Sequence, residues 1–329
     1  MTRAQLKTAI LNVNPSIFDE LALQVFLYQY ENNAVYRQFV DLLKVNPSSV
    51  NDVEKIPFLP ISFFKNFTIK SGNWQEEAVF SSSGTTGQVN SQHFIKEVDF
   101  YNDITKFGFE QFYGNVQQYC ILALLPAYLE RKGSSLVHMA NYFIQQSNNN
   151  NSDFYLYNYE ALAEQLEYNQ NHGIPTLLLG VSFALWDLAE QFPMDLSKVI
   201  IMETGGMKGR RKEVTRTELH AIYNQAFQTT KIHSEYGMTE LLSQAYSKGA
   251  GIFYATPTMR VKIREITDPF AFQINGKVGG VNIIDLANLD SCSFIATDDL
   301  GRLFDDNSFE ILGRFDNSDI RGCNLLVAN

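Results

Sequence analysis

The sequence has little that would suit a nucleic-acid-binding protein, a membrane protein or a secreted disulfide scaffold. Its 26 Lys and Arg residues are outnumbered by 36 Asp and Glu residues. Its one dense basic cluster, residues 208–212, could bind a phosphate, but a solvated loop or helix start is the favoured interpretation. There is no signal-like N-terminal segment and no apolar run of membrane-spanning length. Cys120, Cys292 and Cys323 follow no metal-binding or disulfide spacing. We therefore expect a cytoplasmic protein with reduced thiols, no nucleic-acid partner and no membrane span.

The sequence is rich, by contrast, in residues that form a core. Hydrophobic residues make up 45% of its 329 positions, which is enough for one large domain or two modest ones. The first eighty residues carry apolar positions at helical spacing and are interrupted by Pro47, Pro57 and Pro60. This region is therefore expected to consist mostly of short helices.

Beyond this region the pattern changes to an alternation of strands and helices. Short, continuous apolar runs occupy residues 119–125, 175–179 and 199–202. Helical patterns follow the second and third runs, at residues 182–191 and 212–227. Fully apolar strands separated by helices predict an α/β fold with a buried, mostly parallel sheet.

The last quarter of the chain has the alternating pattern of half-exposed strands. Residues 259–266 alternate regularly, and short β pieces follow at residues 278–285 and 302–312. We expect an α/β core with a helical N-terminal region over residues 1–257 and a small antiparallel β subdomain over residues 258–329.

The most distinctive loop lies at residues 80–87, with the sequence FSSSGTTG. Its glycines allow a tight turn that presents several backbone amides to one point, and its hydroxyl groups add donors, so the loop suits a polyphosphate. It lacks the Gly-Lys-Ser/Thr of the common nucleotide-binding loop. A Ser/Gly-rich linker is the alternative, but the position between two apolar elements favours a phosphate loop.

A second motif, HSEYGMTE, occupies residues 233–240. The ring of Tyr236 beside Gly237 offers a flat face for a purine, and Glu240 offers a carboxylate for Mg²⁺. The alternative is an ordinary boundary between a strand and a helix, with Thr239 as the helix cap.

Two further motifs contain glycines or carboxylates next to turns. Gly205 and Gly206 follow a predicted strand, as glycines do where the backbone lies against a ligand. Asp299 lies in the segment TDDLGR, where a carboxylate beside a tight turn suits the two hydroxyls of a ribose, and Arg314 lies in the segment GRFD.

The four motifs, in this order, resemble those of the adenylate-forming enzymes, a superfamily that includes acyl-CoA synthetases, firefly luciferases and adenylation domains. Within it, residues 124–136 (LLPAYLERKGSSL) and 321–326 (RGCNLL) are similar to the acyl-protein synthetases of bacterial luminescence systems. The resemblance extends over roughly residues 55–329. It implies a layered adenylate-forming domain that uses ATP and Mg²⁺ to activate a carboxylic, and more specifically a fatty, acid.

The resemblance also implies a role for each motif residue. The phosphate loop would hold the ATP phosphates, the paired glycines would lie along the adenine and Tyr236 would stack on it. Thr239 would contact the α-phosphate, Glu240 would bind Mg²⁺, and Asp299 and Arg314 would hold the ribose. The residues implied for the phosphate loop are Ser83, Gly84, Thr85, Thr86 and Gly87.

Compared with the superfamily, the chain lacks two lysines. Asp316 matches the hinge before the C-terminal lid, but only 13 residues follow it (329 minus 316), so we expect the lid and its lysine to be absent. The lysine that often closes the phosphate loop is also missing. Candidates to replace these charges are Lys208, Arg210, Arg321 or a partner protein.

Acyl-protein synthetases that resemble this chain pass the acyl group to a cysteine near their C-terminus and then to a reductase partner. Cys323 matches that cysteine, and a thiolate is a suitable nucleophile toward an adenylate. The alternative is that Cys323 is a small buried residue. CoA and a carrier protein are the other possible acceptors.

The acid pocket is expected around Ser182 and Phe183, in segments rich in Leu, Phe and Ala, which indicates an apolar acid. His233 either lines this pocket or satisfies a buried backbone group. Three alternative functions remain: a CoA ligase that lacks its own lid, a nucleotide- or acyl-binding module without catalysis, and an acyl transferase with Ser182 as nucleophile. The last follows from the segment GVSFA, which resembles a nucleophile elbow but ends in Ala184 instead of glycine.

Overall fold

The computed structural model describes residues 1–82, 90–125, 133–206, 211 and 214–315. No helix within these ranges is both long and apolar enough to cross a lipid bilayer. The candidate residues of the phosphate loop, Lys208, Arg210, Asp316, Arg321 and Cys323 lie outside the described residues.

The N-terminal region is helical, as the sequence predicts. Its elements are α1 (Arg3–Leu11), α2 (Phe18–Asn32), α3 (Ala34–Leu42), 3-10 turns at Pro47–Ser49 and Val53–Lys55, strand β1 (Leu59–Pro60) and α4 (Phe63–Asn66). Asn33 separates α2 from α3 because its side-chain oxygen accepts a hydrogen bond from the amide of Tyr36, at 3.0 Å, and so caps α3. The rings of Phe26 and Tyr36 pack on Phe294, far away in the sequence. These helices therefore cover strands from the other end of the chain.

A small hairpin, β2 (Ala78–Ser81) and β3 (Gln92–Ile95), flanks the predicted phosphate loop. Beyond the paired strands, the Ser82 amide donates to the Ser91 carbonyl at 3.1 Å and the Ser91 amide donates to the Ser82 hydroxyl at 2.9 Å. The two ends of the loop are thus held together by hydrogen bonds.

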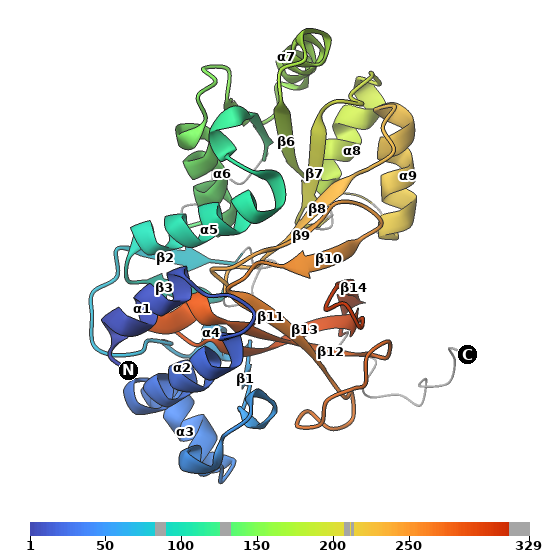
Figure 1. Ribbon diagram of the computed structural model, residues 1–329. Coiled ribbons are helices and arrows are strands. Elements are labelled where there is room, and N and C mark those ends of the chain that lie inside the picture. Colours follow the sequence, from blue (N-terminus) through green and yellow to red (C-terminus); the bar gives the residue numbers. More distant parts are fainter. Residues whose placement is uncertain (83–89, 126–132, 207–210, 212–213, 316–329) are drawn as a thin grey trace.

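A parallel sheet forms the upper lobe in Figure 1, with helices on both sides. Its strands are β4 (Cys120–Leu124), β5 (Asp153–Tyr155), β6 (Thr176–Val181), β7 (Ile200–Thr204) and β8 (His233–Tyr236), in the order β5-β4-β6-β7-β8. Its helices are α5 (Val98–Tyr113), α6 (Ser135–Gln146), α7 (Tyr159–His172), α8 (Ser182–Gln191) and α9 (Arg216–Ala226), with a 3-10 turn at Val116–Gln118. The three apolar runs predicted as strands are β4, β6 and β7, so the α/β prediction is confirmed.

The C-terminal quarter is antiparallel, as its alternating pattern predicts. Its strands are β11 (Met259–Arg264), β12 (Val278–Asp285), β13 (Phe294–Leu303) and β14 (Phe309–Arg314), with a 3-10 turn at Leu286–Asp290. Strands β9 (Ala245–Ser247) and β10 (Ile252–Ala255) connect it to the parallel sheet, because β10 pairs with both β9 and β14. The two lobes in Figure 1 thus share one continuous path of paired strands.

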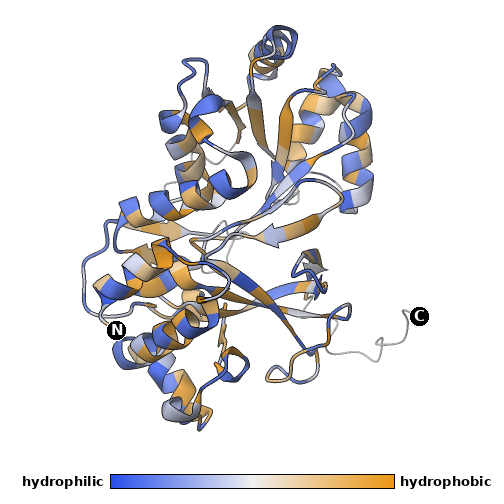
Figure 2. Cartoon of the chain, viewed as in Figure 1, coloured by the Kyte–Doolittle hydropathy of each residue, from blue (hydrophilic) through white to orange (hydrophobic). Residues whose placement is uncertain are grey.

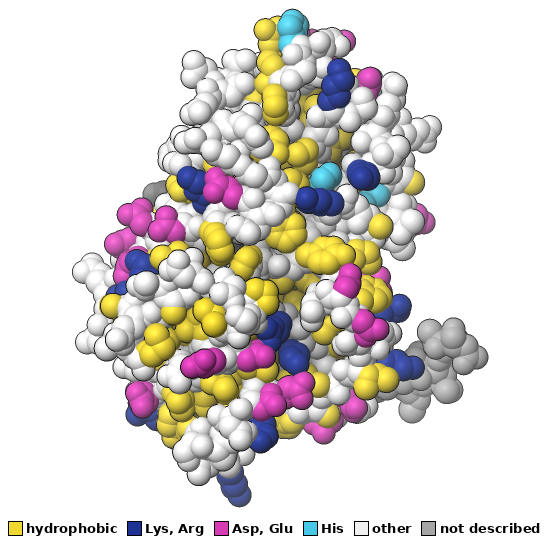
Figure 3. Space-filling model, viewed as in Figure 1, with side chains coloured by type: hydrophobic (Ala, Val, Ile, Leu, Met, Phe, Trp, Pro, Cys, Tyr) yellow, Lys and Arg dark blue, Asp and Glu magenta, His cyan; other side chains and the backbone are white. Residues whose placement is uncertain are grey.

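Two groups of buried side chains correspond to the two lobes. One combines residues from 6–104 with residues from 241–309, and the other draws on residues 109–246. Orange, hydrophobic residues fill the strands of both lobes in Figure 2. On the face seen in Figure 3, Lys and Arg side chains are scattered among Asp and Glu side chains rather than gathered in one basic patch.

Candidate active site

A cavity of about 1770 Å³ opens where the two lobes meet. Its wall includes the ends of β7 and β8, the start of α9, the turn after β8 and the edge formed by β13 and β14. The motif residues that the structure describes, from Gly205 to Arg314, converge on this cavity from distant parts of the sequence.

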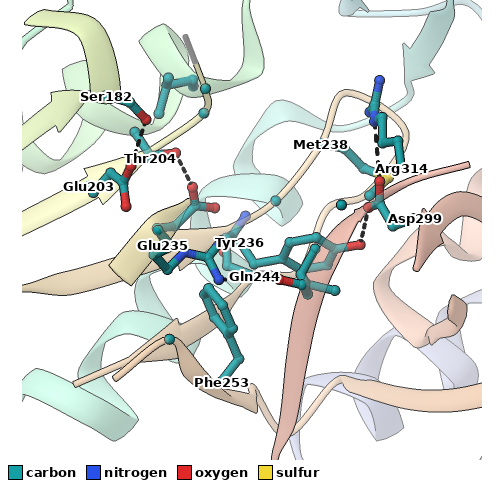
Figure 4. Close-up of a pocket in the computed structure, with 18 of the residues that line it drawn as sticks. Ser182, Glu203, Thr204, Glu235, Tyr236, Met238, Gln244, Phe253, Asp299 and Arg314 are labelled. Carbon is teal, nitrogen blue, oxygen red and sulfur yellow. Dashed lines mark hydrogen bonds and ion pairs between the residues drawn. The ribbon is translucent and has the colours of Figure 1, made fainter. Parts of the chain in front are cut away.

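At one end of the cavity, Asp299 is held by two side chains (Figure 4). The Tyr236 hydroxyl donates to Asp299 Oδ2 at 2.7 Å, and Arg314 Nε donates to Asp299 Oδ1 at 3.1 Å. The antiparallel register pairs Asp299 directly with Arg314, which explains their proximity. Burial raises the pKa of Tyr236 well above 10, and the Asp299 charge raises it further. The charge of Asp299 and its hydrogen bond raise the pKa of the Arg314 guanidinium.

The turn after β8 presents Glu240 and Thr239 to the cavity. Within the described residues no helix follows this turn, so Thr239 does not act as a helix cap; the next element is β9. His93 on β3 donates from Nδ1 to the Thr239 carbonyl at 2.9 Å, and Asn288 donates its amide to the Glu240 carbonyl at 2.7 Å. The turn is therefore fixed by side chains from β3 and from the 3-10 turn before β13.

His93 was not predicted from the sequence. Its other ring nitrogen, Nε2, lies 2.8 Å from the Ser291 hydroxyl, and the ring is buried. Burial lowers the pKa of His93 to about 4, so it is neutral at pH 7, with Nδ1 as donor and Nε2 as acceptor. Nothing in the local sequence distinguishes this histidine, because both of its partners are distant in the chain.

Glu240 is 6% exposed and lines the cavity. Burial raises its pKa, although the hydroxyl of Ser91 and the charges of Arg314 and Lys65 act in the opposite direction. A charged carboxylate is costly to bury, and a bound divalent cation would offset that desolvation cost. Glu240 therefore suits the role of a cation ligand. Within the described residues no cluster of three or more His, Cys, Asp and Glu side chains could hold a metal ion.

The paired glycines after β7 border open space. Gly205 has a φ of +69°, in the left-handed region that glycine adopts without strain. A Cβ added to Gly206 would meet no atom within 4 Å, so the backbone here faces the cavity directly. This arrangement leaves room for a flat ligand next to the backbone.

Of the three residues predicted at the acid pocket, Ser182 lines the cavity, whereas Phe183 and His233 do not. Phe183 is 3% exposed and belongs to the core of the upper lobe. His233 Nδ1 lies 3.1 Å from the Tyr113 hydroxyl, and burial lowers the pKa of the ring to about 4. His233 thus has a side-chain partner inside the protein.

Ser182 belongs to a buried cluster that the sequence did not reveal (Figure 4). Its hydroxyl donates to Glu203 Oε1 at 2.6 Å, and His220 Nε2 contacts Glu203 Oε2 at 2.8 Å. The serine therefore donates to a carboxylate, and no histidine is placed to accept its proton. This geometry does not support Ser182 as an acyl-transferase nucleophile.

A family model described as acyl-protein synthetase, LuxE, matches residues 11–126. No curated protein matches the chain. Among solved structures, the ATP-bound form of MatB from Rhodopseudomonas palustris is similar, with a TM-score of 0.54 and 13% identity over 72% of this chain and 48% of that chain. The chain thus spans about half the length of MatB.

Two further solved structures are similar. One is 2-hydroxyisobutyryl-CoA ligase in complex with 2-HIB-AMP and CoA, with a TM-score of 0.65 and 14% identity over 96% of this chain and 70% of that chain. The other is the luciferase-like enzyme of the nonluminescent mealworm Zophobas morio, with a TM-score of 0.50 and 16% identity over 75% of this chain and 60% of that chain. At these identities the likeness shows the fold.

The comparisons agree with the resemblance drawn from the motifs. The solved structures share the layered α/β fold, and the matched family is the acyl-protein synthetase family to which residues 124–136 and 321–326 pointed. The chain has the fold of these solved ligases and of the luciferase-like enzyme, and its residues 11–126 match the LuxE acyl-protein synthetase family model.

Proposed function

We propose that the protein uses ATP to activate a carboxylic acid as its acyl-adenylate and then transfers the acyl group to a thiol. The proposal is carried by the convergence of Asp299, Tyr236 and Glu240 on one cavity, with the paired glycines on its wall. The fold and the family match support the same chemistry.

The described residues suit the nucleoside part of ATP. Each oxygen of Asp299 accepts one hydrogen bond, from Tyr236 or Arg314, and its remaining lone pair is available to a ribose hydroxyl. The open space beside Gly206 and the ring of Tyr236 would accommodate the adenine.

Glu240 is the residue that would hold Mg²⁺, which would offset the charge that develops on the phosphate oxygens. A bound cation would in turn stabilise the charged form of a carboxylate that burial disfavours. Thr239 would contact the α-phosphate, from a turn that His93 and Asn288 hold in place.

In the first step, an oxygen of the acid attacks the α-phosphorus and the bond to the pyrophosphate oxygen breaks. This step needs charge stabilisation more than proton transfer. Lys65 on α4 is a basic side chain that lines the cavity, and its charge lowers the pKa of Glu240. We infer that Lys65 supplies part of the positive charge for which Lys208, Arg210 and Arg321 are the other candidates.

In the second step, a thiolate attacks the acyl carbon and AMP leaves. Cys323 is our proposed acceptor, on the strength of the sequence resemblance, with a reductase as the subsequent partner in the cytoplasm. A fatty acid is the substrate that this resemblance favours.

The experiment combines purified protein, ATP and Mg²⁺ with a panel of labelled fatty and aryl acids. Acid-dependent pyrophosphate release is expected, with label on the wild-type protein but not on Cys323→Ser. Release without label on the protein would indicate CoA or a carrier protein as acceptor. No release with any acid would contradict the enzymatic proposal and leave a nucleotide- or acyl-binding module.

A further inference from the structure

Two acceptor side chains border the same part of the cavity wall. Glu235, next to Tyr236 on β8, and Gln244, directly before β9, both line the cavity although they are only 9% and 4% exposed. Glu235 lies opposite Tyr246 in the β8–β9 register, so Gln244, two residues before Tyr246, projects from the same face. A Cβ added at Gly237 would lie 2.4 Å from Glu235 Oε1 and 3.7 Å from Gln244 Cγ, which places both side chains around one small space.

Neither acceptor has a full set of donors within the described part of the chain. Glu235 Oε2 accepts a hydrogen bond from Thr204 Oγ1 at 2.5 Å, and no described Lys, Arg or His forms an ion pair with its carboxylate. Gln244 donates to the Leu242 carbonyl at 3.0 Å, but its own side-chain oxygen has no partner. Burial raises the pKa of Glu235 to about 7, which reflects the cost of a carboxylate without a nearby cation. Buried acceptors of this kind normally have partners, so the arrangement requires an explanation.

The cavity wall contains apolar and aromatic side chains beside its polar ones. Tyr101 lies close enough for the Glu235 charge to raise its pKa, and its hydroxyl is engaged with the Ser135 carbonyl at 3.2 Å. Leu136 and Met139 on α6 also line the cavity. The cavity wall thus offers apolar side chains as well as the two oxygen acceptors.

We infer that this end of the cavity binds a hydrogen-bond-donating substituent, a hydroxyl or an amino group, on the acid that the enzyme activates. The inference rests on the proposed function, because it takes the cavity to bind a carboxylic acid. Glu235 and Gln244 accept from the substituent, and Tyr101, Leu136 and Met139 contact the carbon skeleton. An unsubstituted fatty chain would leave the Gln244 oxygen buried without a donor and Glu235 with the Thr204 hydroxyl as its donor, which corresponds to a preference of roughly ten- to hundredfold for the substituted acid.

The test uses matched acids that differ by one group: hexanoate with its terminal hydroxy- and amino-substituted analogues, and phenylacetate with its para-hydroxy and para-amino analogues. Two readouts are measured, kcat/KM for pyrophosphate release and binding of each acid by calorimetry without ATP. The wild type is expected to prefer substituted acids about tenfold or more in both, and the comparison of hydroxyl with amine identifies the donor.

Glu235→Leu is expected to abolish or reverse this preference. Glu235→Gln, which keeps the shape and one acceptor, is expected to lose any preference for the amine over the hydroxyl, and it remains informative if the leucine variant does not fold. Glu310→Gln is the matched control, because Glu310 lines the same cavity but is paired with Arg302 at 3.3 Å. Tyr246→Phe tests the alternative that the Tyr246 hydroxyl, which has no partner among the described residues, donates a hydrogen bond to Glu235. If it does, Tyr246→Phe and Glu235→Leu would change acid binding in the same way.

Equal or stronger binding of unsubstituted acids by the wild type, or an unchanged preference in Glu235→Leu, would overturn the inference. Pyrophosphate release without such selectivity would leave the proposed function intact and refute the inference alone. Selective binding of substituted acids without any pyrophosphate release would support the inference and contradict the proposed enzymatic activity.

Discussion

Replacement of Asp299 by alanine is the substitution with the most specific expected effect. Its two oxygens accept from Tyr236 at 2.7 Å and from Arg314 at 3.1 Å, and the carboxylate is 5% exposed. Hydrogen bonds to a charged group contribute about 1.5–3 kcal/mol. If the ribose hydroxyls bind this carboxylate, Asp299→Ala should weaken ATP binding roughly 10- to 100-fold.

The substitution also has a cost to folding, which is of similar size to the cost to ATP binding and must be measured separately. The Arg314 side chain is 73% exposed, so its ion pair with Asp299 contributes at most about 1 kcal/mol. Loss of the Tyr236 hydrogen bond, which is also a bond to a charged group, adds about 1.5–3 kcal/mol. Stability from urea unfolding and ATP affinity from calorimetry should therefore separate the two effects.

Asp298→Ala is the matched control, because Asp298 is the neighbouring carboxylate on β13 and lines the same cavity but is exposed. It should bind ATP within about twofold of the wild type. Wild-type ATP affinity in Asp299→Ala, or an equal loss in both variants, would refute the ribose role of Asp299.

Four further predictions follow from the site. Glu240→Gln should raise the Mg²⁺ concentration needed for half-maximal pyrophosphate release about tenfold or more, since a charged ligand is lost; an unchanged Mg²⁺ titration would exclude Glu240 as the ligand. His93→Ala should cost about 2–4 kcal/mol in urea unfolding and lower kcat more than ATP affinity, because the Thr239 carbonyl loses its donor; an unchanged kcat in the folded variant would contradict this positioning role. Lys65→Ala should lower kcat about tenfold with little effect on unfolding, because the side chain is exposed, and an unchanged kcat would remove it as the replacement cation. Glu235 has a pKa of about 7 when folded and an ordinary value of 4.5, so the folded state binds more protons and the wild type loses stability as the pH rises from 4.5 to 7. Glu235→Gln should therefore gain stability relative to the wild type over this interval, by at most about 3 kcal/mol. A difference in unfolding free energy that stays constant with pH would contradict the burial effect.

The elements that were predicted correctly are those whose signal is local. Strands β4, β6 and β7 are buried on both faces and are therefore continuous apolar runs, whereas β11 has one exposed face and alternates. The packing of the N-terminal helices against the C-terminal strands could not be predicted from such local patterns. Phe26 meets Phe294 across the whole length of the chain, and nothing near either residue specifies the other.

The same limit applies to the site. Asp299, Tyr236 and Glu240 were predicted because each lies in a recognisable motif, and the structure places all three on one cavity. His93 and Gln244 were missed because their importance arises from partners that the fold brings near them. Glu235 lies inside a recognised motif, but its burial, and the absence of an ion pair with any described cation, follow from tertiary packing and are invisible in the sequence.

The most direct test of the proposed activity is acid-dependent exchange of labelled pyrophosphate into ATP, which reports adenylate formation without regard to the acyl acceptor. The wild type is predicted to catalyse exchange only when a suitable acid is present, and Asp299→Ala is predicted to require a roughly 10- to 100-fold higher ATP concentration. Exchange that is independent of any acid, or absent with every acid although ATP binds, would contradict the conclusion that this cavity forms an acyl-adenylate.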